Sequence, residues 1–171
     1  MASATGHPPL IITLNINEKA QAFFGEQRRL YFPKHINYLD AHLTFFHNLP
    51  SDDAMIKDSL IQFSGRPSFE MQVTGVRHLG NGVAYALHSP ELQDMHLKMQ
   101  TEFRNLISGK DKQKLWPHIT VQNKVTANKA DILYRSLNRT FTPLSVTATG
   151  LSSWLYLNGP WEKKDEFSFR T

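Results

Sequence analysis

A short motif that occurs twice, at matched positions, limits what this chain can fold into. The tripeptide HLT at 42–44 recurs as HIT at 118–120. A Thr-Gly pair follows each copy, with Gly75 lying 33 positions after the first motif histidine and Gly150 lying 32 positions after the second. In each half the patterns predict a helix, the HxT strand, a second helix and then two strands joined by a turn. Because both the spacing and the element order match, we predict a bilobal α+β fold made of two pseudo-symmetric halves with interleaved termini.

Apolar, β-branched runs predict the strands, and capped segments with helical periodicity predict the helices. The expected strands are 10–16, 41–49, 68–79, 83–87, 118–125, 144–148 and 154–157, with a last short strand near Phe167. The expected helices are 18–30, 52–64, 90–107 and 127–137, with N-caps at Asn17, Ser51, Ser89 and Thr126. The dipeptide Asn81-Gly82 predicts a two-residue hairpin turn. The length of 171 residues suits a single bilobal domain over 1–171.

Composition excludes several kinds of site. The chain has no cysteine, which excludes disulfides, thiolate nucleophiles and cysteine-ligated metals, and fits a reducing compartment. Met1 to Leu10 lacks the basic region and long apolar run of a secretory signal, and no apolar stretch approaches the roughly 18 residues of a membrane span. We expect a cytoplasmic monomer with no membrane partner. The formal charge of +4 and the pI near 9.4 slightly favour a polyanionic partner, RNA or a nucleotide.

Alternation along a strand brings the motif residues to one side. Residues i and i+2 of a strand share a face, so His42 lies beside Thr44 and His118 beside Thr120. If the halves pack about a pseudo-twofold axis, the two imidazoles face one cleft, where one can accept a proton and the other donate one at neutral pH. The threonine hydroxyls can donate hydrogen bonds to phosphoryl oxygens. The pattern predicts acid–base phosphoryl chemistry that needs neither a metal nor another cofactor.

The paired HLTF and HITV segments resemble the signature of the 2H phosphoesterase superfamily, which includes the 2′-5′ RNA ligase-like proteins. The strings AHLTFFHNLP and WPHITVQNKV resemble a bacterial subgroup of the 2′-5′ RNA ligase family. The resemblance implies two antiparallel sheets lining a central groove, with helices outside. It implies hydrolysis of 2′,3′-cyclic phosphate ends of RNA or nucleotides, usually to a 2′-phosphate, or cleavage and reversible formation of 2′-5′ linkages. It also implies an acid–base pair of His42 and His118, with the hydroxyls of Thr44 and Thr120 holding the phosphate.

The sequence departs from this family where a phosphate-binding cation is expected. Ligase-type members often carry an aromatic residue five positions after the first motif histidine and an arginine five positions after the second. These positions hold His47 and Asn123 here. The cation is then expected from Lys124, from Arg28 or Arg29, or is missing.

The candidates for contact with the rest of the substrate follow from strand alternation. Phe46, Gln122 and Lys124 face the same way as the catalytic pair if alternation is strict, whereas a β-bulge would change that assignment. Phe46 or His47 is the candidate partner of a nucleobase. The expected substrate-binding residues are therefore Phe46, His47, Gln122 and Lys124.

Plainer interpretations stand beside these. A histidine in an apolar strand is usually a packing residue, and the remaining histidines show no partner pattern: His7, His35, His78, His88 and His96. The basic segment 110–114 is expected to be a solvated connection, and Trp161 to pack as a lid rather than to stack on a base. Two other functions remain open, a non-catalytic RNA-binding or nucleotide-binding module of the same fold, and a structural or protein-interaction domain.

Overall fold

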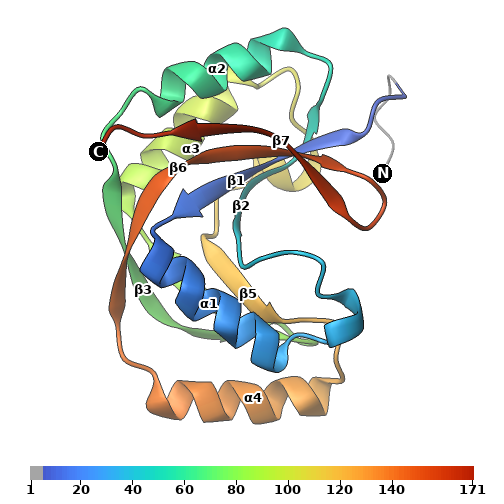
Figure 1. The fold of residues 1–171 in the computed structure, drawn as a ribbon, viewed down its shortest axis with the longest axis vertical. Helices are drawn as coiled ribbons and strands as arrows, with labels where there is room; N and C mark the ends of the chain where they lie inside the picture. Colours follow the sequence, from blue (N-terminus) through green and yellow to red (C-terminus); the bar gives the residue numbers. More distant parts are fainter. Residues whose placement is uncertain (1–5) are drawn as a thin grey trace.

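A computed structural model describes residues 6–171 of the chain (Figure 1). Residues 1–5, part of the segment in which no secretory signal was expected, lie outside the described residues. The strands are β1 (Pro9–Ile16), β2 (Leu43–Pro50), β3 (Phe69–His78), β4 (Val83–His88), β5 (His118–Gln122), β6 (Leu144–Tyr156) and β7 (Trp161–Ser168). The helices are α1 (Glu18–Tyr31), α2 (Ala54–Ser64), α3 (Pro90–Glu102) and α4 (Ala127–Thr140), with short 3-10 turns η1 (Lys34–Ile36) and η2 (Gly109–Lys112). No helix of the described chain is long and apolar enough to cross a membrane.

The order of the elements repeats along the chain. After β1, the series α1-β2-α2-β3-β4 is followed by α3-β5-α4-β6-β7. The strand order β2-β1-β6-β3-β4-β5 is itself symmetric when β2, β1 and β6 correspond to β5, β4 and β3. The sequence repeat requires this correspondence, because the two HxT motifs lie at β2 and β5. The predicted bilobal α+β duplication is confirmed.

The strands are joined by hydrogen bonds into one sheet rather than two, so the two-sheet detail is not confirmed. The long strand β6 pairs antiparallel with β3 through residues 144–148 and with β1 through residues 148–155, and it connects the two lobes. Figure 1 shows β6 and β3 running between the upper and the lower lobe. The sequence predicted two short strands, 144–148 and 154–157, where β6 is continuous. Gly150, Ser152 and Ser153 interrupt the apolar pattern there, although all three are buried in the sheet.

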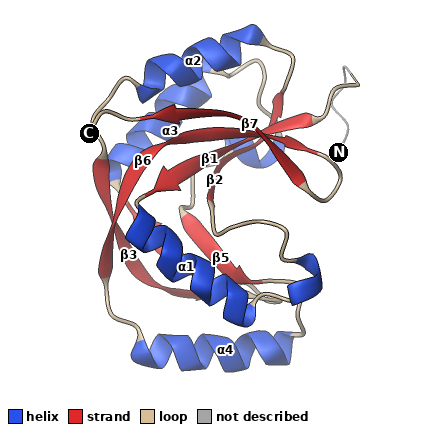
Figure 2. Ribbon diagram, viewed as in Figure 1, coloured by secondary structure: helices blue, strands red, loops and turns tan. Residues whose placement is uncertain are grey.

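Helices cover both lobes from the outside (Figure 2). In one lobe α2 packs against β6, β7 and α3, and in the other α1 contacts β5 while α4 contacts β3 and β4. Helices α1 and α2 of the first half thus lie on strands of the second half, which interleaves the halves around a common core. Phe24 of α1, Leu43 of β2 and Met99 of α3 are fully buried in that core.

Two of the four predicted N-caps are confirmed. The Ser89 hydroxyl accepts a hydrogen bond from the Leu92 N–H at 3.1 Å, and the Thr126 hydroxyl accepts one from the Lys129 N–H at 3.2 Å. Helix α3 ends at Glu102 rather than near residue 107, and the backbone continues as turns.

Asn17 does hold the N-cap position of α1 but makes no side-chain capping hydrogen bond, and the prediction of Ser51 as the cap of α2 is wrong. Each of these two side chains has a long-range partner instead. The Asn17 Oδ1 accepts a hydrogen bond from the Thr147 N–H of β6 at 2.9 Å, which extends the sheet beyond β1. The Ser51 hydroxyl donates to the Pro8 carbonyl oxygen at 2.6 Å. The cap of α2 is Asp53, whose carboxylate accepts from the backbone of the helix's first turn.

The β3–β4 turn lies one residue earlier than predicted. Leu79 and Gly82 close the turn through a backbone hydrogen bond of 2.8 Å, so its central residues are Gly80 and Asn81. Gly80 supplies the positive φ of 92° that this turn needs. Gly82 allows β5 to approach closely, because a Cβ atom there would lie 2.0 Å from the Gln122 carbonyl oxygen of β5.

Candidate active site

The two motif histidines are held in the same way at the start of their strands. His42 directly precedes β2, and His118 is the first residue of β5. The His42 Nδ1 lies 2.9 Å from the Asp40 carbonyl oxygen, and the His118 Nδ1 lies 2.8 Å from the Trp116 carbonyl oxygen. A carbonyl oxygen only accepts hydrogen bonds, so in each neutral ring Nδ1 carries the proton. Both Nε2 atoms are therefore left as proton acceptors.

The strands that follow the two histidines approach each other closely. Cα atoms of β2 and β5 come within 8 Å of one another. Thr44 of β2 and His118 of β5 line the same pocket. Burial is the main cause that lowers the pKa of His42, and the charge of His118 adds to it. Two segments that are far apart in the sequence thus share one place in the fold.

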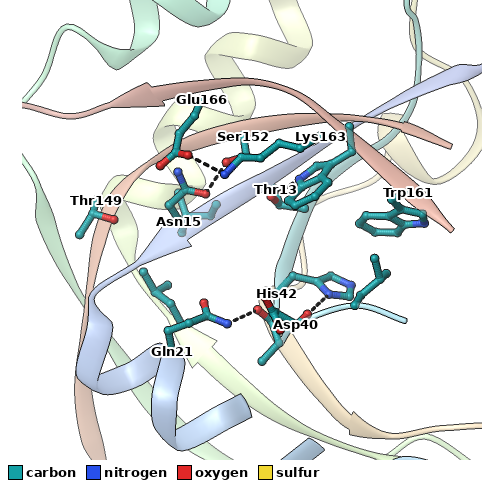
Figure 3. Close-up of a pocket in the computed structure, with 15 residues that line it drawn as sticks. Thr13, Asn15, Gln21, Asp40, His42, Thr149, Ser152, Trp161, Lys163 and Glu166 are labelled. Carbon is teal, nitrogen blue, oxygen red and sulfur yellow. Dashed lines mark hydrogen bonds and ion pairs between the residues drawn. The ribbon is translucent and has the colours of Figure 1, made fainter. Parts of the chain in front are cut away.

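A pocket beside His42, which we call the Trp161 pocket, opens on strands β1, β6 and β7 (Figure 3). Its polar and aromatic lining consists of Thr13, Asn15, Gln21, Asp40, His42, Thr149, Ser152, Trp154, Trp161, Lys163 and Glu166. Ring centroids of His42 and Trp161 lie 4.9 Å apart. Burial lowers the pKa of His42 to about 4, against the hydrogen bond to Asp40, and the charge of Arg28 contributes in the same direction as burial.

A second pocket lies beside His118, and we call it the Lys110 pocket. Its lining consists of Thr44, Phe45, His47, Leu79, His96, Lys110, Asp111, Gln113, Lys114, Leu115, Trp116 and His118. The Trp116 indole stacks on the His118 ring, with centroids 4.1 Å apart and planes inclined by 23°. Burial lowers the pKa of His118, and the charges of His47 and Lys110 add to that effect against the hydrogen bond to Trp116.

Both motif threonines are partly exposed; Thr44 lines the Lys110 pocket with His118, whereas Thr120 lines neither pocket. Among residues 6–171, neither the Thr44 hydroxyl nor the Thr120 hydroxyl has a hydrogen-bond partner in the protein. The Thr120 carbonyl oxygen instead accepts a hydrogen bond from the Arg28 guanidinium at 3.1 Å. The hydroxyls are therefore available to a bound anion.

Within residues 6–171, no three or more histidine or carboxylate side chains gather closely enough to hold a metal ion. The carboxylate nearest to the Lys110 pocket, Asp111, is occupied by backbone N–H groups of β2. The two histidines thus supply proton acceptors, and the two threonine hydroxyls supply donors that could bind an oxyanion.

The sequence matches the profile of the 2′-5′ RNA ligase superfamily over residues 16–160, which is most of its length. The chain belongs to this superfamily. The predicted membership of the 2H phosphoesterase superfamily is thereby confirmed. No curated protein gives a significant match to the sequence.

Solved structures of the same fold include relatives of low sequence identity. TT0787 of Thermus thermophilus is 14% identical at a TM-score of 0.64, with 95% of this chain and 98% of that chain covered. LigT of E. coli complexed with 3′-AMP is 16% identical at a TM-score of 0.58, and LigT in apo form is 14% identical at 0.60. Both LigT comparisons cover 96% of this chain and 99% of LigT. Across these proteins the fold is shared.

The side chains of β2 do not alternate strictly between the two faces of the sheet. This changes the positions of two predicted site residues, Phe46 and His47. Thr13 pairs with Thr44 but the neighbouring Ile12 pairs with Phe46, so β2 holds an extra residue between Thr44 and Phe46, a β-bulge, and a second register shift follows between Phe46 and Leu49. Phe46 is consequently buried at 0% exposure and stacks on His96 with centroids 4.8 Å apart. The prediction that Phe46 contacts substrate is corrected, whereas His47 lines the Lys110 pocket.

Gln122 and Lys124 line neither the Trp161 pocket nor the Lys110 pocket. Strand β5 ends at Gln122, which is 6% exposed and whose Oε1 has no hydrogen-bond partner among the described residues. Lys124 adopts a positive φ of 59° in the following turn. The predicted alternation from His118 to Lys124 therefore stops at the strand end, and the structure does not bring these two residues to the histidines.

The two arginines proposed as alternative cations have other partners. Arg28 is 4% exposed, its Nε donates to the Asn37 side chain at 3.1 Å, and its guanidinium lies over the Phe32 ring. Burial lowers the pKa of Arg28 to about 10. Arg29 is exposed on α1 and pairs with Glu26. Arg28 thus supports the site through the Thr120 carbonyl oxygen, and Arg29 lines neither pocket.

Sequence reasoning missed the role of Asp111, which lies in the basic segment expected to be a solvated connection. Asp111 is 2% exposed. Its carboxylate accepts hydrogen bonds from the backbone N–H groups of His47 at 2.8 Å and Asn48 at 2.9 Å. The only signal in the sequence is a single acid within SGKDKQK, which local patterns do not connect to β2.

Proposed function

We propose that this protein is a phosphoesterase that acts on 2′,3′-cyclic phosphate or 2′-5′ phosphodiester bonds of RNA or nucleotides, without a metal ion, with His42 and His118 as the acid–base pair. The observation that carries the proposal is the matching orientation of the two imidazoles. In each ring Nδ1 donates to a backbone carbonyl oxygen, and Nε2 has no hydrogen-bond partner among residues 6–171. Membership of the 2′-5′ RNA ligase superfamily supports the same chemistry.

In the proposed hydrolysis of a 2′,3′-cyclic phosphate, the Nε2 of one histidine takes a proton from water while the water oxygen bonds to phosphorus. The P–O3′ bond breaks, and the protonated Nε2 of the other histidine gives its proton to O3′. The product is a 2′-phosphate, and proton exchange with solvent restores both rings. In a 2′-5′ linkage the adjacent 3′-hydroxyl replaces water as the nucleophile, O5′ leaves, and the product is the cyclic phosphate.

This scheme needs one neutral and one protonated histidine, although the pKa of each is lowered in the unliganded protein. A phosphodiester anion beside the rings favours the imidazolium form and raises these pKa values when substrate binds. The hydroxyls of Thr44 and Thr120 would donate to the non-bridging oxygens, where charge gathers in the transition state. Substrate binding thereby completes the protonation state that catalysis uses.

A nucleotide substrate has further support from the relatives. LigT structures hold 3′-AMP, NADP+ or ATP. In this chain the Trp161 pocket and the Lys110 pocket lie beside His42 and His118, respectively. They leave space for the groups on both sides of a phosphodiester.

The test is an assay of the purified protein with 2′,3′-cyclic nucleotides, and with 2′-5′ and 3′-5′ dinucleotides, in the presence and absence of EDTA. We expect turnover of a cyclic phosphate or a 2′-5′ dinucleotide, a 2′-phosphate from the cyclic substrates, and no effect of EDTA. The 3′-5′ dinucleotide is the matched negative control. Binding in calorimetry without any product would instead support the non-catalytic module, and loss of turnover in EDTA would contradict the metal-independent scheme.

A further inference from the structure

The positive charge beside His118 comes from a short basic segment rather than from the motif strands. Lys110 and Lys114 line the Lys110 pocket together with Thr44 and His118. Neither lysine takes part in any of the ion pairs within residues 6–171. By contrast Lys163, the cation of the Trp161 pocket, is paired with a glutamate of β7. The uncompensated charge therefore lies on the His118 side of the site.

The segment that carries Lys110 is held in place by buried hydrogen bonds. The Asp111 carboxylate binds the backbone N–H groups of His47 and Asn48 at the bulge of β2. From the other side, the Gln100 Nε2 of α3 donates to the Asp111 carbonyl oxygen at 2.8 Å. These contacts fix Asp111, the residue next to Lys110. They therefore also fix the position of the Lys110 Cα atom relative to β2.

The other cations near the histidines are less available to a phosphate. Arg28 is buried, and two of its guanidinium nitrogens are bound to protein oxygens. Arg29 is paired on the outer side of α1, and Lys124 lines neither pocket. Lys110 combines an unpaired ammonium, a place in the pocket of His118 and Thr44, and a rigid backbone position.

We infer that Lys110 binds a non-bridging oxygen of the reacting phosphoryl group, and that Asp111 is the positioning residue that holds Lys110 against the bulge of β2. The inference rests on the proposed function, because it names the cation of the same site. An ammonium at this place offsets the charge that develops on the phosphoryl oxygens. A cation that contacts the reacting phosphate must act equally on a mononucleotide and on a longer RNA, whereas one that contacts a neighbouring phosphate acts on the longer RNA alone.

The experiment compares Lys110→Gln, Lys110→Arg and Lys112→Gln. Lys112 is the matched control, since it lies in the same short turn but lines a different pocket without His118. The substrates are 2′,3′-cyclic AMP and a short RNA that ends in a cyclic phosphate. We expect Lys110→Gln to lower kcat/KM by about 10-fold or more on both substrates, Lys110→Arg to restore most of the loss, and Lys112→Gln to match the native protein. Native kcat/KM on cyclic AMP in Lys110→Gln, with or without a loss on RNA, would overturn the inference.

Calorimetry with adenosine 2′-phosphate separates this inference from the proposed function. If the native protein turns over no substrate, the proposed function fails, while about 10-fold weaker binding in Lys110→Gln still supports the anion contact. Unchanged binding in that variant overturns the contact. For Asp111→Asn we expect similarly weakened binding in the folded protein, and no further loss when Lys110→Gln is added. Native affinity in folded Asp111→Asn would overturn the positioning role.

Discussion

The ring of Trp161 packs against the ring of His42, with centroids 4.9 Å apart and planes inclined by 54°. Trp161 is the first residue of β7, so a hairpin near the C-terminus covers a histidine that precedes β2 (Figure 3). Burial is the main cause of the low His42 pKa of about 4. Trp161 thus packs on the His42 ring and is one of the groups that bury it.

Replacement of Trp161 by alanine should raise the pKa of His42 from about 4 toward the ordinary value of 6.5, because water then reaches the ring. The measurement is an NMR titration of the His42 ring resonances. Leu157→Ala is the control, since this residue of the same hairpin region is 42% exposed and lines no pocket with His42. An unchanged His42 pKa in Trp161→Ala would contradict the assigned cause.

The threonine hydroxyls should matter for turnover and little for folding. Thr44→Val and Thr120→Val keep the side-chain shape but remove the hydroxyl donor that we propose for the phosphoryl oxygens. We expect each to lower kcat by about 10- to 100-fold. This loss lies at or below the lower end of the range that is usual for removal of one transition-state donor. Thr44→Ser and Thr120→Ser keep the hydroxyl and should retain most of the activity. Valine variants with native kcat would show that these hydroxyls do not touch the reacting phosphate.

His96 should make the protein less stable in acid. The ring is 3% exposed and stacks on Phe46, and burial lowers its pKa to about 4, against a hydrogen bond to the Phe45 backbone. The unfolded chain, with a histidine pKa of about 6.5, binds more protons between pH 6.5 and 4. Stability is therefore complete above about pH 6.5 and falls as the pH drops toward 4, with a slope of up to about 1.4 kcal/mol per pH unit.

The measurement is the free energy of urea unfolding at several pH values for the native protein, His96→Phe and the exposed control His88→Gln. His96→Phe should lose about 1 kcal/mol at pH 7.5, because the Phe45 carbonyl oxygen loses its donor. Its stability should then fall less steeply with acid than that of the native protein. His88→Gln should follow the native curve. Parallel curves for His96→Phe and the native protein would mean that another group titrates.

The architecture follows from the sequence because its signals are local and occur twice. The strand and helix order, the Ser89 and Thr126 caps and the pairing of the HxT motifs all rest on residues close together in the chain. Internal duplication then relates the two halves without any knowledge of long-range contacts. The prediction that His42 and Thr44 act together with His118 and Thr120 rests on the same duplication.

The remaining details depend on contacts between distant segments. The β2 bulge that buries Phe46 is fixed by pairing with β1, and strict alternation cannot anticipate it. The Asn17 side chain accepts a hydrogen bond from the Thr147 N–H of β6 instead of from an N–H of α1. Asp111 lies in a polar loop, and its burial depends on two N–H groups left free at the β2 bulge. Local patterns contain none of these tertiary partners.

The most direct test of the acid–base pair is single-turnover hydrolysis of 2′,3′-cyclic AMP by His42→Ala, His118→Ala and the exposed control His88→Ala. Both motif variants should react at least ~100-fold more slowly than the native protein, the usual scale for loss of a general acid or base, while the control keeps the native rate. The double variant should be little worse than either single variant, since the two groups act in one step. A near-native rate in either His42→Ala or His118→Ala would contradict the paired mechanism.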